Sequence, residues 1–513
     1  MTDHTLSFTQ NDLQNLFPSA IPSSIVIHND AAYWLQSKDG RKQLGIFARS
    51  ENPLLDRFHG KSSSPQIGYA LKLGATNHAN ARALRAVLDW LTPKPIGLAT
   101  SAGTGDRLGL ATPGHVLAFQ AVNGNIVPIF AQQSIREMQR TGRSADEVMT
   151  DATFGTFEAG WRSLVGADAD HLKVPADIDT CVAAGFSFYT IDPGAHVDSE
   201  ADNASPSIIQ AKVAALPWRD LESSASDLTH RYVGKRIQLE SRAITLDELA
   251  MLRAAAKYGK AIAHVTQMYR HLAAKNIPSE LEVSVDETET PTTHAEHIYV
   301  ASELKRLGVK WVSLAPRYIG RFEKGVDYIG DPSTSSGQAL IEFEKDFAIH
   351  AEIARAFGPY KLSIHSGSDK FSVYPATMRQ TRGLVHLKTA GTSYLEALRT
   401  IAAFDPGLFR AIYVFGRDRY ETDRASYHVS AQLSRAPKSE EVKDADLPAL
   451  LNQFDAREIL HVTFGSVLTT RKSDGHFIFY DDFMALLRSH PDAYAENLKA
   501  HFIKHLKPFA SKG

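Results

Sequence analysis

The spacing of hydrophobic and polar positions changes near residue 95. Before that point the chain contains a few short elements, which are strand-like runs at 24–28, 32–36 and 43–49 and an amphipathic helical pattern at 77–91. Asp39-Gly40 separates the last two runs, and this dipeptide is typical of a hairpin turn. The pattern predicts an N-terminal α+β extension over residues 1–92.

From residue 95 onward, short apolar runs alternate with longer helical patterns. The runs lie at 96–100, 126–130, 161–165, 186–191, 281–285, 311–315, 362–364 and 384–387. The helical patterns lie at 114–122, 134–149, 176–184, 245–273, 294–307 and 340–357. Such alternation predicts βα units on a parallel sheet, and eight repeats predict a (β/α)₈ TIM-like barrel over 93–400. A polar insertion around 194–240 follows the fourth run.

The remaining residues, 401–513, are expected to form a largely helical C-terminal region packed on the barrel. Helices are predicted at 446–452, 455–464, 483–489 and 492–505.

Composition excludes several classes of protein. Lys plus Arg total 56 against 58 Asp plus Glu, a formal charge of −2, so a basic face for nucleic acid or an anionic membrane is not expected. Cys181 is the sole cysteine, which excludes an internal disulfide framework and a Cys-rich metal site. The polar N-terminus and the lack of an 18-residue apolar run predict a soluble, cytoplasmic protein. A homo-oligomer is left open.

Polar clusters follow nearly every predicted strand, where the active sites of (β/α)₈ barrels lie. The glycines around Arg107 depart from the spacing of a dinucleotide loop, which favours a sugar or carboxylate contact by Arg107. Gln132, after the second run, could bind hydroxyl groups. Arg317, after the sixth run, could bind a carboxylate as a fork, and Asp331 could be a metal ligand or a helix cap.

The third and fifth clusters hold the acid–base candidates. Asp170 and His171 are adjacent at a predicted strand end and could supply one acid–base group and one metal ligand, or they could lie in an exposed loop. Asp286, Glu287 and Glu289 repel one another unless a cation or hydrogen bonds compensate them. Some of these acids could instead serve the N-terminus of the next helix.

The seventh run ends in His365, followed by a Ser/Gly loop, which is a common arrangement for a metal ligand. Ser366, Asp369 and Lys370 in this loop are substrate-binding candidates, and Ser366 and Lys370 could hold an anionic group. Lys388, on the eighth run, could form a Schiff base or pair with substrate oxygens.

A metal site in this chain must use His and carboxylate ligands, which suit Zn, Mn, Co, Ni or Fe. His171, Asp331 and His365 could form an open site of this kind. Because they lie far apart in the sequence, their spacing does not establish the set.

Several long stretches carry a family resemblance. They are GDRLGLATPGH (105–115), PIFAQQSIREMQRTGR (128–143), ADHLK (169–173), VDETETPT (285–292), VSLAPRYIGRFEKGVDYIGD (312–331), KLSIHSGSDKFSVYP (361–375) and HLKTAGTSYLEALR (386–399). In these stretches the sequence resembles the tagaturonate epimerase family. The resemblance implies a divalent-metal enzyme that interconverts D-tagaturonate and D-fructuronate, and related enzymes also act slowly on tagatose and fructose.

The resemblance also implies roles for individual residues. At matching positions His171, Asp331 and His365 look like metal ligands, and Asp170 looks like the proton acceptor. A carboxylate of 285–292, Glu287 or Glu289, looks like the proton donor.

The chemistry of such a reaction can be argued separately. The inverted carbon lies β to the ketone, so enolisation does not acidify its C–H bond. Retro-aldol cleavage is available instead: a base removes the hydroxyl proton, and the aldehyde half rotates and adds back on its other face. Transient oxidation is the rival, but the sequence offers no convincing nicotinamide loop.

Two alternative functions remain open at the level of sequence. The first is a metal-dependent aldolase or ketose isomerase with the same site. The second is a non-catalytic sugar-acid binding protein, which the many acids and histidines at strand ends disfavour.

Overall fold

The N-terminal part of the chain is a five-stranded antiparallel sheet with a helix on each face. The computed structural model describes residues 8–38, 41–331 and 333–510. The sheet has the order β1-β2-β3-β5-β4 and consists of β1 (Val26–His28), β2 (Ala31–Lys38), β3 (Arg41–Arg49), β4 (Lys61–Gln66) and β5 (Tyr69–Ala75). Strands β2 and β3 pair as predicted, although the predicted turn at 39–40 lies outside the described residues. The last two strands were not predicted.

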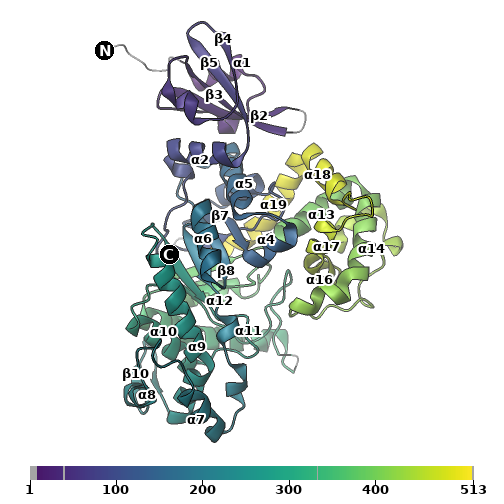
Figure 1. The fold of residues 1–513 in the computed structure, drawn as a ribbon. Helices are drawn as coiled ribbons and strands as arrows, with labels where there is room; N and C mark the ends of the chain where they lie inside the picture. Colours follow the sequence, from purple (N-terminus) through teal and green to yellow (C-terminus); the bar gives the residue numbers. More distant parts are fainter. Residues whose placement is uncertain (1–7, 39–40, 332, 511–513) are drawn as a thin grey trace.

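Alternation along β2 explains the two covered faces. Tyr33 packs in one core with α2 (His78–Val87), whereas Trp34 packs in another with α1 (Gln10–Leu16). Phe154 and Phe157 of α5 (Ala145–Glu158) join the first of these cores, so the sheet rests on the side of the central domain (Figure 1).

The central domain is the predicted closed barrel of eight parallel strands. Its order is β6 (Ser101–Gly103), β7 (Val127–Ser134), β8 (Gly166–Leu172), β9 (Phe188–Ile191), β12 (Glu280–Ser284), β13 (Ser313–Ala315), β14 (Lys361–Ile364) and β15 (Val385–Lys388). Strands β6 and β8 begin at 101 and 166, just after the apolar runs predicted at 96–100 and 161–165. Their interior positions hold small or acidic residues such as Gly103 and Asp168, so they lack the apolar pattern of a buried strand.

Helices surround this barrel. They are α3 (Thr112–Val122), α4 (Ile135–Thr141), α5, α6 (Pro175–Ala184), α9 (Glu248–Ala273), α10 (His294–Arg306), α11 (Ser336–Phe357), α12 (Tyr374–Thr381) and α13 (Thr392–Phe404). The single helix predicted at 134–149 is two helices. Gly142 ends α4 with a left-handed φ of 67°, and Ser144 caps the start of α5.

The insertion between β9 and α9 is structured. It contains α7 (Pro206–Ala214), α8 (Ala225–Tyr232) and the hairpin of β10 (Arg236–Gln238) and β11 (Ala243–Thr245). Figure 1 shows these elements at the end of the molecule opposite the N-terminal sheet.

The C-terminal region is largely helical. It contains α14 (Pro406–Asp423), α15 (Leu447–Leu450), α16 (Phe454–Val462), α17 (Phe464–Thr469), α18 (Tyr480–Ser489) and α19 (Pro491–Leu506). Helix α19 packs against α3 and α13 of the barrel, and α13 runs across the predicted boundary at residue 400. The C-terminal region therefore packs directly on the barrel, and α13 belongs to both parts. Within the described residues, no helix combines the length and apolar character needed to cross a membrane.

His115 in α3 makes the packing of α3 against α13 and α19 dependent on pH. Its imidazole is fully buried, lies 2.8 Å from Ser393 Oγ and contacts the Phe502 ring of α19. Burial lowers the pKa of His115 from 6.5 to about 4. As the pH falls below 6.5, the unfolded chain takes up this proton before the folded chain does, so folding stability is lost between pH 6.5 and 4.

We predict that His115→Gln flattens the dependence of the unfolding free energy on pH by up to about 1.4 kcal/mol per pH unit in this range. Urea unfolding at pH 4.5, 5.5 and 7 measures the slope. His230→Gln, at an exposed position of α8, is the control and should keep the parental slope. Equal slopes for all three proteins would contradict the prediction.

Candidate active site

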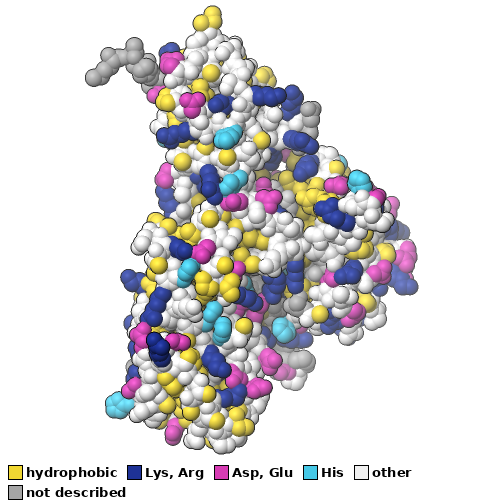
Figure 2. Space-filling model, viewed as in Figure 1, with side chains coloured by type: hydrophobic (Ala, Val, Ile, Leu, Met, Phe, Trp, Pro, Cys, Tyr) yellow, Lys and Arg dark blue, Asp and Glu magenta, His cyan; other side chains and the backbone are white. Residues whose placement is uncertain are grey.

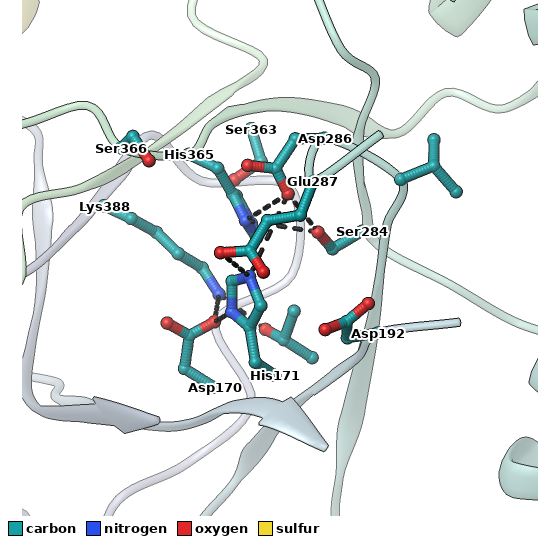
Figure 3. A network of polar contacts seen from close by, with 12 residues as sticks. Asp170, His171, Asp192, Ser284, Asp286, Glu287, Ser363, His365, Ser366 and Lys388 are labelled. Atoms are coloured by element: carbon teal, nitrogen blue, oxygen red, sulfur yellow. Dashed lines mark hydrogen bonds and ion pairs between the residues drawn. The ribbon is translucent and has the colours of Figure 1, made fainter. Parts of the chain in front are cut away.

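The carboxyl ends of β8, β12, β14 and β15 bring most of the predicted chemistry together (Figure 3). On β8, Asp168 and Asp170 face the barrel interior while Ala169 packs in the surrounding core. Regular alternation would turn His171 away from the interior. His171 instead has a left-handed φ of 54°, and the strand register shifts there, so Asp170 and His171 both reach the site.

An ammonium group lies at the centre of the cluster. Lys388 Nζ lies 2.9 Å from Asp168 Oδ2, 2.7 Å from Asp170 Oδ1 and 2.8 Å from Glu282 Oε1, and it donates to Thr190 Oγ1 at 2.6 Å. Burial lowers the pKa of Lys388, but the three carboxylates raise it well above its ordinary value. Lys388 is therefore held as a cation by its carboxylate partners, which disfavours a role as a Schiff-base nucleophile. Although it borders a cavity, its donors are already used, which argues against the predicted substrate contact.

Both histidines lie between carboxylates. His365 Nε2 is 2.6 Å from Glu282 Oε1, and its Nδ1 is 3.1 Å from Asp286 Oδ1. His171 Nδ1 is 2.7 Å from Asp170 Oδ1, and its Nε2 is 4.0 Å from Asp286 Oδ1. Each imidazole is thus held by a carboxylate on one nitrogen and turns its other nitrogen toward Asp286.

The carboxylates dominate the electrostatics of both rings. Burial lowers the pKa of His171, but Asp170 and Glu287 raise it to about 9. Burial likewise lowers the pKa of His365, and Asp286 and Glu282 raise it to about 10. The carboxylates around the two rings therefore favour positive charge at this position.

These features fit a divalent metal. Metal-binding histidines usually donate their second nitrogen to a carboxylate, as His171 does to Asp170 and His365 to Glu282. Within the described chain, His171 Nε2 is buried without a hydrogen-bond partner. Asp170, His171 and His365 each place a ligand atom within 4.8 Å of the others. Asp286 Oδ1 lies 3.1 Å from His365 Nδ1 and 4.0 Å from His171 Nε2, so Asp286 is a second candidate for the carboxylate ligand beside Asp170.

Asp331, the predicted third ligand, does not lie in this cluster. Its side chain is exposed, and its Oδ1 accepts hydrogen bonds from the backbone N and the Oγ of Ser333 at 2.8 and 2.6 Å. It organises the turn before α11, whereas Ser335 caps that helix, so Asp331 lies neither in the histidine cluster nor at a helix cap.

Two adjoining cavities open onto the histidines. The larger, about 290 Å³, is bordered by Glu287 and Arg317, and the smaller, about 50 Å³, by Arg107, Gln132 and Asp170. Ser366 borders both, as His365 does. Figure 2 shows Lys, Arg, Asp, Glu and His side chains along the furrow between the barrel and the C-terminal helices. Arg107, Gln132, Arg317, Ser366, Asp170 and Glu287 therefore lie where the sequence places them.

Three other predicted residues do not border these two cavities. Lys370 is fully buried and donates to backbone carbonyls, among them those of Glu323 and Ser368. Asp369 is buried against Arg457, with a 2.7 Å contact to its Nη2. Glu289 is exposed and borders a separate outer cavity. The first two stabilise the loop after β14.

Several important residues were missed. Asp286 belongs to the acidic stretch 285–292, but the sequence does not single it out as a ligand. Glu282 alternates with Leu281 and Val283 in a run interpreted as apolar, and a charge at an inward strand position was the available signal. Tyr427 and His461 reach the cavities from the C-terminal region, where nothing in the sequence connected them with the barrel.

Comparisons with known proteins identify the family of this chain. The sequence profile of the family described as tagaturonate epimerase matches residues 21–509. The tagaturonate/fructuronate epimerase of Thermotoga maritima is 46% identical over 398 residues, which covers 76% of this chain and 78% of that protein. The chain belongs to the tagaturonate epimerase family.

Solved members of the tagaturonate epimerase family share the whole architecture. A glycerol-bound crystal structure of fructuronate-tagaturonate epimerase from Cohnella laeviribosi is 36% identical, with a TM-score of 0.89, covering 98% of this chain and 99% of that one. The native crystal structure of the same protein is 35% identical, with the same TM-score and coverage. The predicted barrel with its N-terminal extension and helical C-terminal region is confirmed as the fold.

We predict that Asp286→Ala weakens binding of Mn²⁺ by at least about tenfold, because it removes the carboxylate that faces both histidines. Isothermal titration calorimetry on the metal-depleted protein measures this affinity directly. Asp331→Ala is the matched control and should bind Mn²⁺ like the parent. Weakened Mn²⁺ binding in Asp331→Ala, with parental binding in Asp286→Ala, would contradict the prediction and identify Asp331 as the ligand.

Proposed function

We propose that this chain interconverts D-tagaturonate and D-fructuronate and uses a divalent metal held by His171, His365 and Asp286. The observation that carries the proposal is the pair of imidazoles, each held by a carboxylate and each facing Asp286 with its second nitrogen. Membership of the tagaturonate epimerase family and the name of the Thermotoga relative support the choice of substrate.

A bound divalent ion would act as a Lewis acid on substrate oxygens. The remaining chemistry belongs to the chain. Burial raises the pKa of Asp170, but His171 and Lys388 lower it well below its ordinary range, so Asp170 is ionised at neutral pH and able to accept a proton. Gln132 Nε2 donates to Asp170 Oδ2 at 3.1 Å and fixes the orientation of the carboxylate.

Glu287 is the second carboxylate of the proposed reaction. It lies on the other side of His171, with Oε1 3.7 Å from Nε2, and Arg136 Nη2 binds it at 2.8 Å. A reversible epimerisation needs two such groups, because the hydroxyl oxygen lies on different sides of the inverted carbon before and after the reaction.

The proton and bond changes then balance. Asp170 takes the hydroxyl proton, and the bond between the inverted carbon and the carbon α to the ketone breaks. The aldehyde half rotates, and the same bond forms on its other face. Burial raises the pKa of Glu287, but His171, Lys324 and Arg136 lower it to about 2, so Glu287 is ionised and accepts the hydroxyl proton in the reverse direction. In the forward direction the new alkoxide takes a proton from water, and Asp170 releases its captured proton to water, which restores the starting state.

The activity itself is tested by incubating the metal-depleted chain with D-tagaturonate, with and without Mn²⁺, and following products by ¹³C NMR. We expect D-fructuronate to appear only in the metal-containing sample. Accumulated three-carbon fragments would indicate an aldolase, and a displaced carbonyl would indicate a ketose isomerase. Turnover that persists with excess chelator would contradict the metal requirement.

We further predict that Asp170→Asn loses at least about a hundredfold in kcat, a typical contribution of a general base, while still binding Mn²⁺. Initial rates and calorimetry on the same preparation separate the two properties. Glu289→Gln, at the exposed position of the same acidic stretch as Glu287, should retain parental turnover. Near-normal turnover of Asp170→Asn would exclude Asp170 as the base.

A further inference from the structure

Acidic and cationic side chains both border the two adjoining cavities. Asp286 and Glu287 border the larger cavity, and Asp170 borders the smaller one. Arg107 borders the smaller cavity, and Lys324 borders both. Whether a carboxylate can bind here therefore depends on which of the cations are already paired with acidic side chains.

Most of the cations around the cavities are already paired. The cations that border them are Arg107, Arg136, Arg317, Arg321, Lys324 and Lys388. In the described part of the chain, Arg107, Arg136, Arg321 and Lys388 each have a carboxylate within 4.0 Å, whereas Lys324 and Arg317 have none. Lys324 borders both cavities, whereas Arg317 borders only the larger one.

Lys324 is also close to His365. Its Nζ donates to Ser366 Oγ at 2.6 Å, and Ser366 directly follows His365. A small substrate bound beside His365 is therefore within reach of this ammonium group.

Buried side chains fix the backbone on both sides of Lys324. Lys370 Nζ donates to the carbonyl of Glu323 at 2.7 Å, and Arg457 Nε donates to that of Gly325 at 2.5 Å. Arg457 is itself fixed by Asp369. These buried charges are used to position one short loop, whose Lys324 side chain reaches both cavities.

Arg107 offers a second donor beside the smaller cavity. Its Nε and Nη2 bind Glu137 Oε1 at 3.0 and 2.5 Å, and its guanidinium lies over the Phe464 ring at 3.5 Å. The remaining nitrogen, Nη1, is buried without a hydrogen-bond partner in the described chain, and the Arg107 side chain is only 4% exposed. A buried charged donor of this kind favours an anionic acceptor.

We propose that Lys324, together with Arg107, binds the carboxylate of the keto-hexuronate and sets the preference for uronates over neutral ketoses. This inference rests on the proposed function. In a keto-hexuronate the carboxylate lies two carbons from the carbon that is inverted, so the molecule has a neutral hydroxyl-bearing part and a charged end close together. The two cavities present the matching arrangement, with the acid-rich site at His365 and the unpaired ammonium group beside Ser366.

The test compares a charged and a neutral ligand in one assay. The KM for D-tagaturonate and the competitive inhibition constant of D-tagatose are measured for the parent, Lys324→Met and Lys324→Gln, each loaded with Mn²⁺. Gln retains a donor that can reach Ser366 Oγ but carries no charge. We expect both variants to raise the KM for tagaturonate by about ten- to a hundredfold, a typical effect of losing a charged hydrogen bond. The inhibition constant of tagatose should change less than about threefold.

Two further variants complete the comparison. Lys324→Arg keeps the charge and should recover most of the affinity for tagaturonate. Arg317→Met removes the other unpaired cation and should leave the ratio of the two constants close to the parental value. Thermal melting of each protein establishes that it is folded.

The outcomes separate this inference from the proposed function. If the parent does not turn over tagaturonate, the proposed function fails and the inference fails with it. If the parent is active, an unchanged KM in both Lys324 variants, an equal weakening of both ligands, or a selective loss in Arg317→Met would overturn the role of Lys324 alone.

Discussion

The site depends on one ammonium group inside the barrel. Lys388 binds carboxylates from two other strands, Asp168 and Asp170 on β8 and Glu282 on β12, together with Thr190 on β9. Without this cation, three buried carboxylates would repel one another at close range, which is strongly destabilising. Two of the same carboxylates hold His171 and His365, so the position of each imidazole follows from the position of Lys388.

The barrel supplies the acids and histidines of the site, and the C-terminal region helps to position two cations beside them. Arg457 holds the loop that carries Lys324, and the Phe464 ring packs against the guanidinium of Arg107. Because α13 and α19 join the barrel and the C-terminal region in continuous packing, the distance between these cations and the histidines depends on the whole fold. A rigid cavity of this kind orients a substrate at little further cost in conformational entropy.

The sequence allowed the barrel to be predicted because six of its strands coincide with apolar runs at βα spacing, and the other two, β6 and β8, begin directly after such a run. Strand-end residues such as Asp170, His171 and His365 were found for the same reason. Asp331 was misplaced because an acid before Pro and Ser residues caps a turn as readily as it binds a metal. Lys370 was misassigned because sequence does not tell whether a lysine donates to a ligand or to backbone carbonyls. Lys324 does not stand out in the sequence, because sequence does not tell which neighbouring cations are already neutralised.

The location of Lys388 on β15 also has a consequence for how the protein folds. β15 is the last strand of the barrel to be synthesised, whereas the acids that it neutralises belong to β8 and β12. Until β15 lies between β14 and β6, the acids of β8 and β12 lack this counter-charge. The closed ring is therefore favoured over a ring without its last strand, because only the closed ring can bury these carboxylates together with a cation.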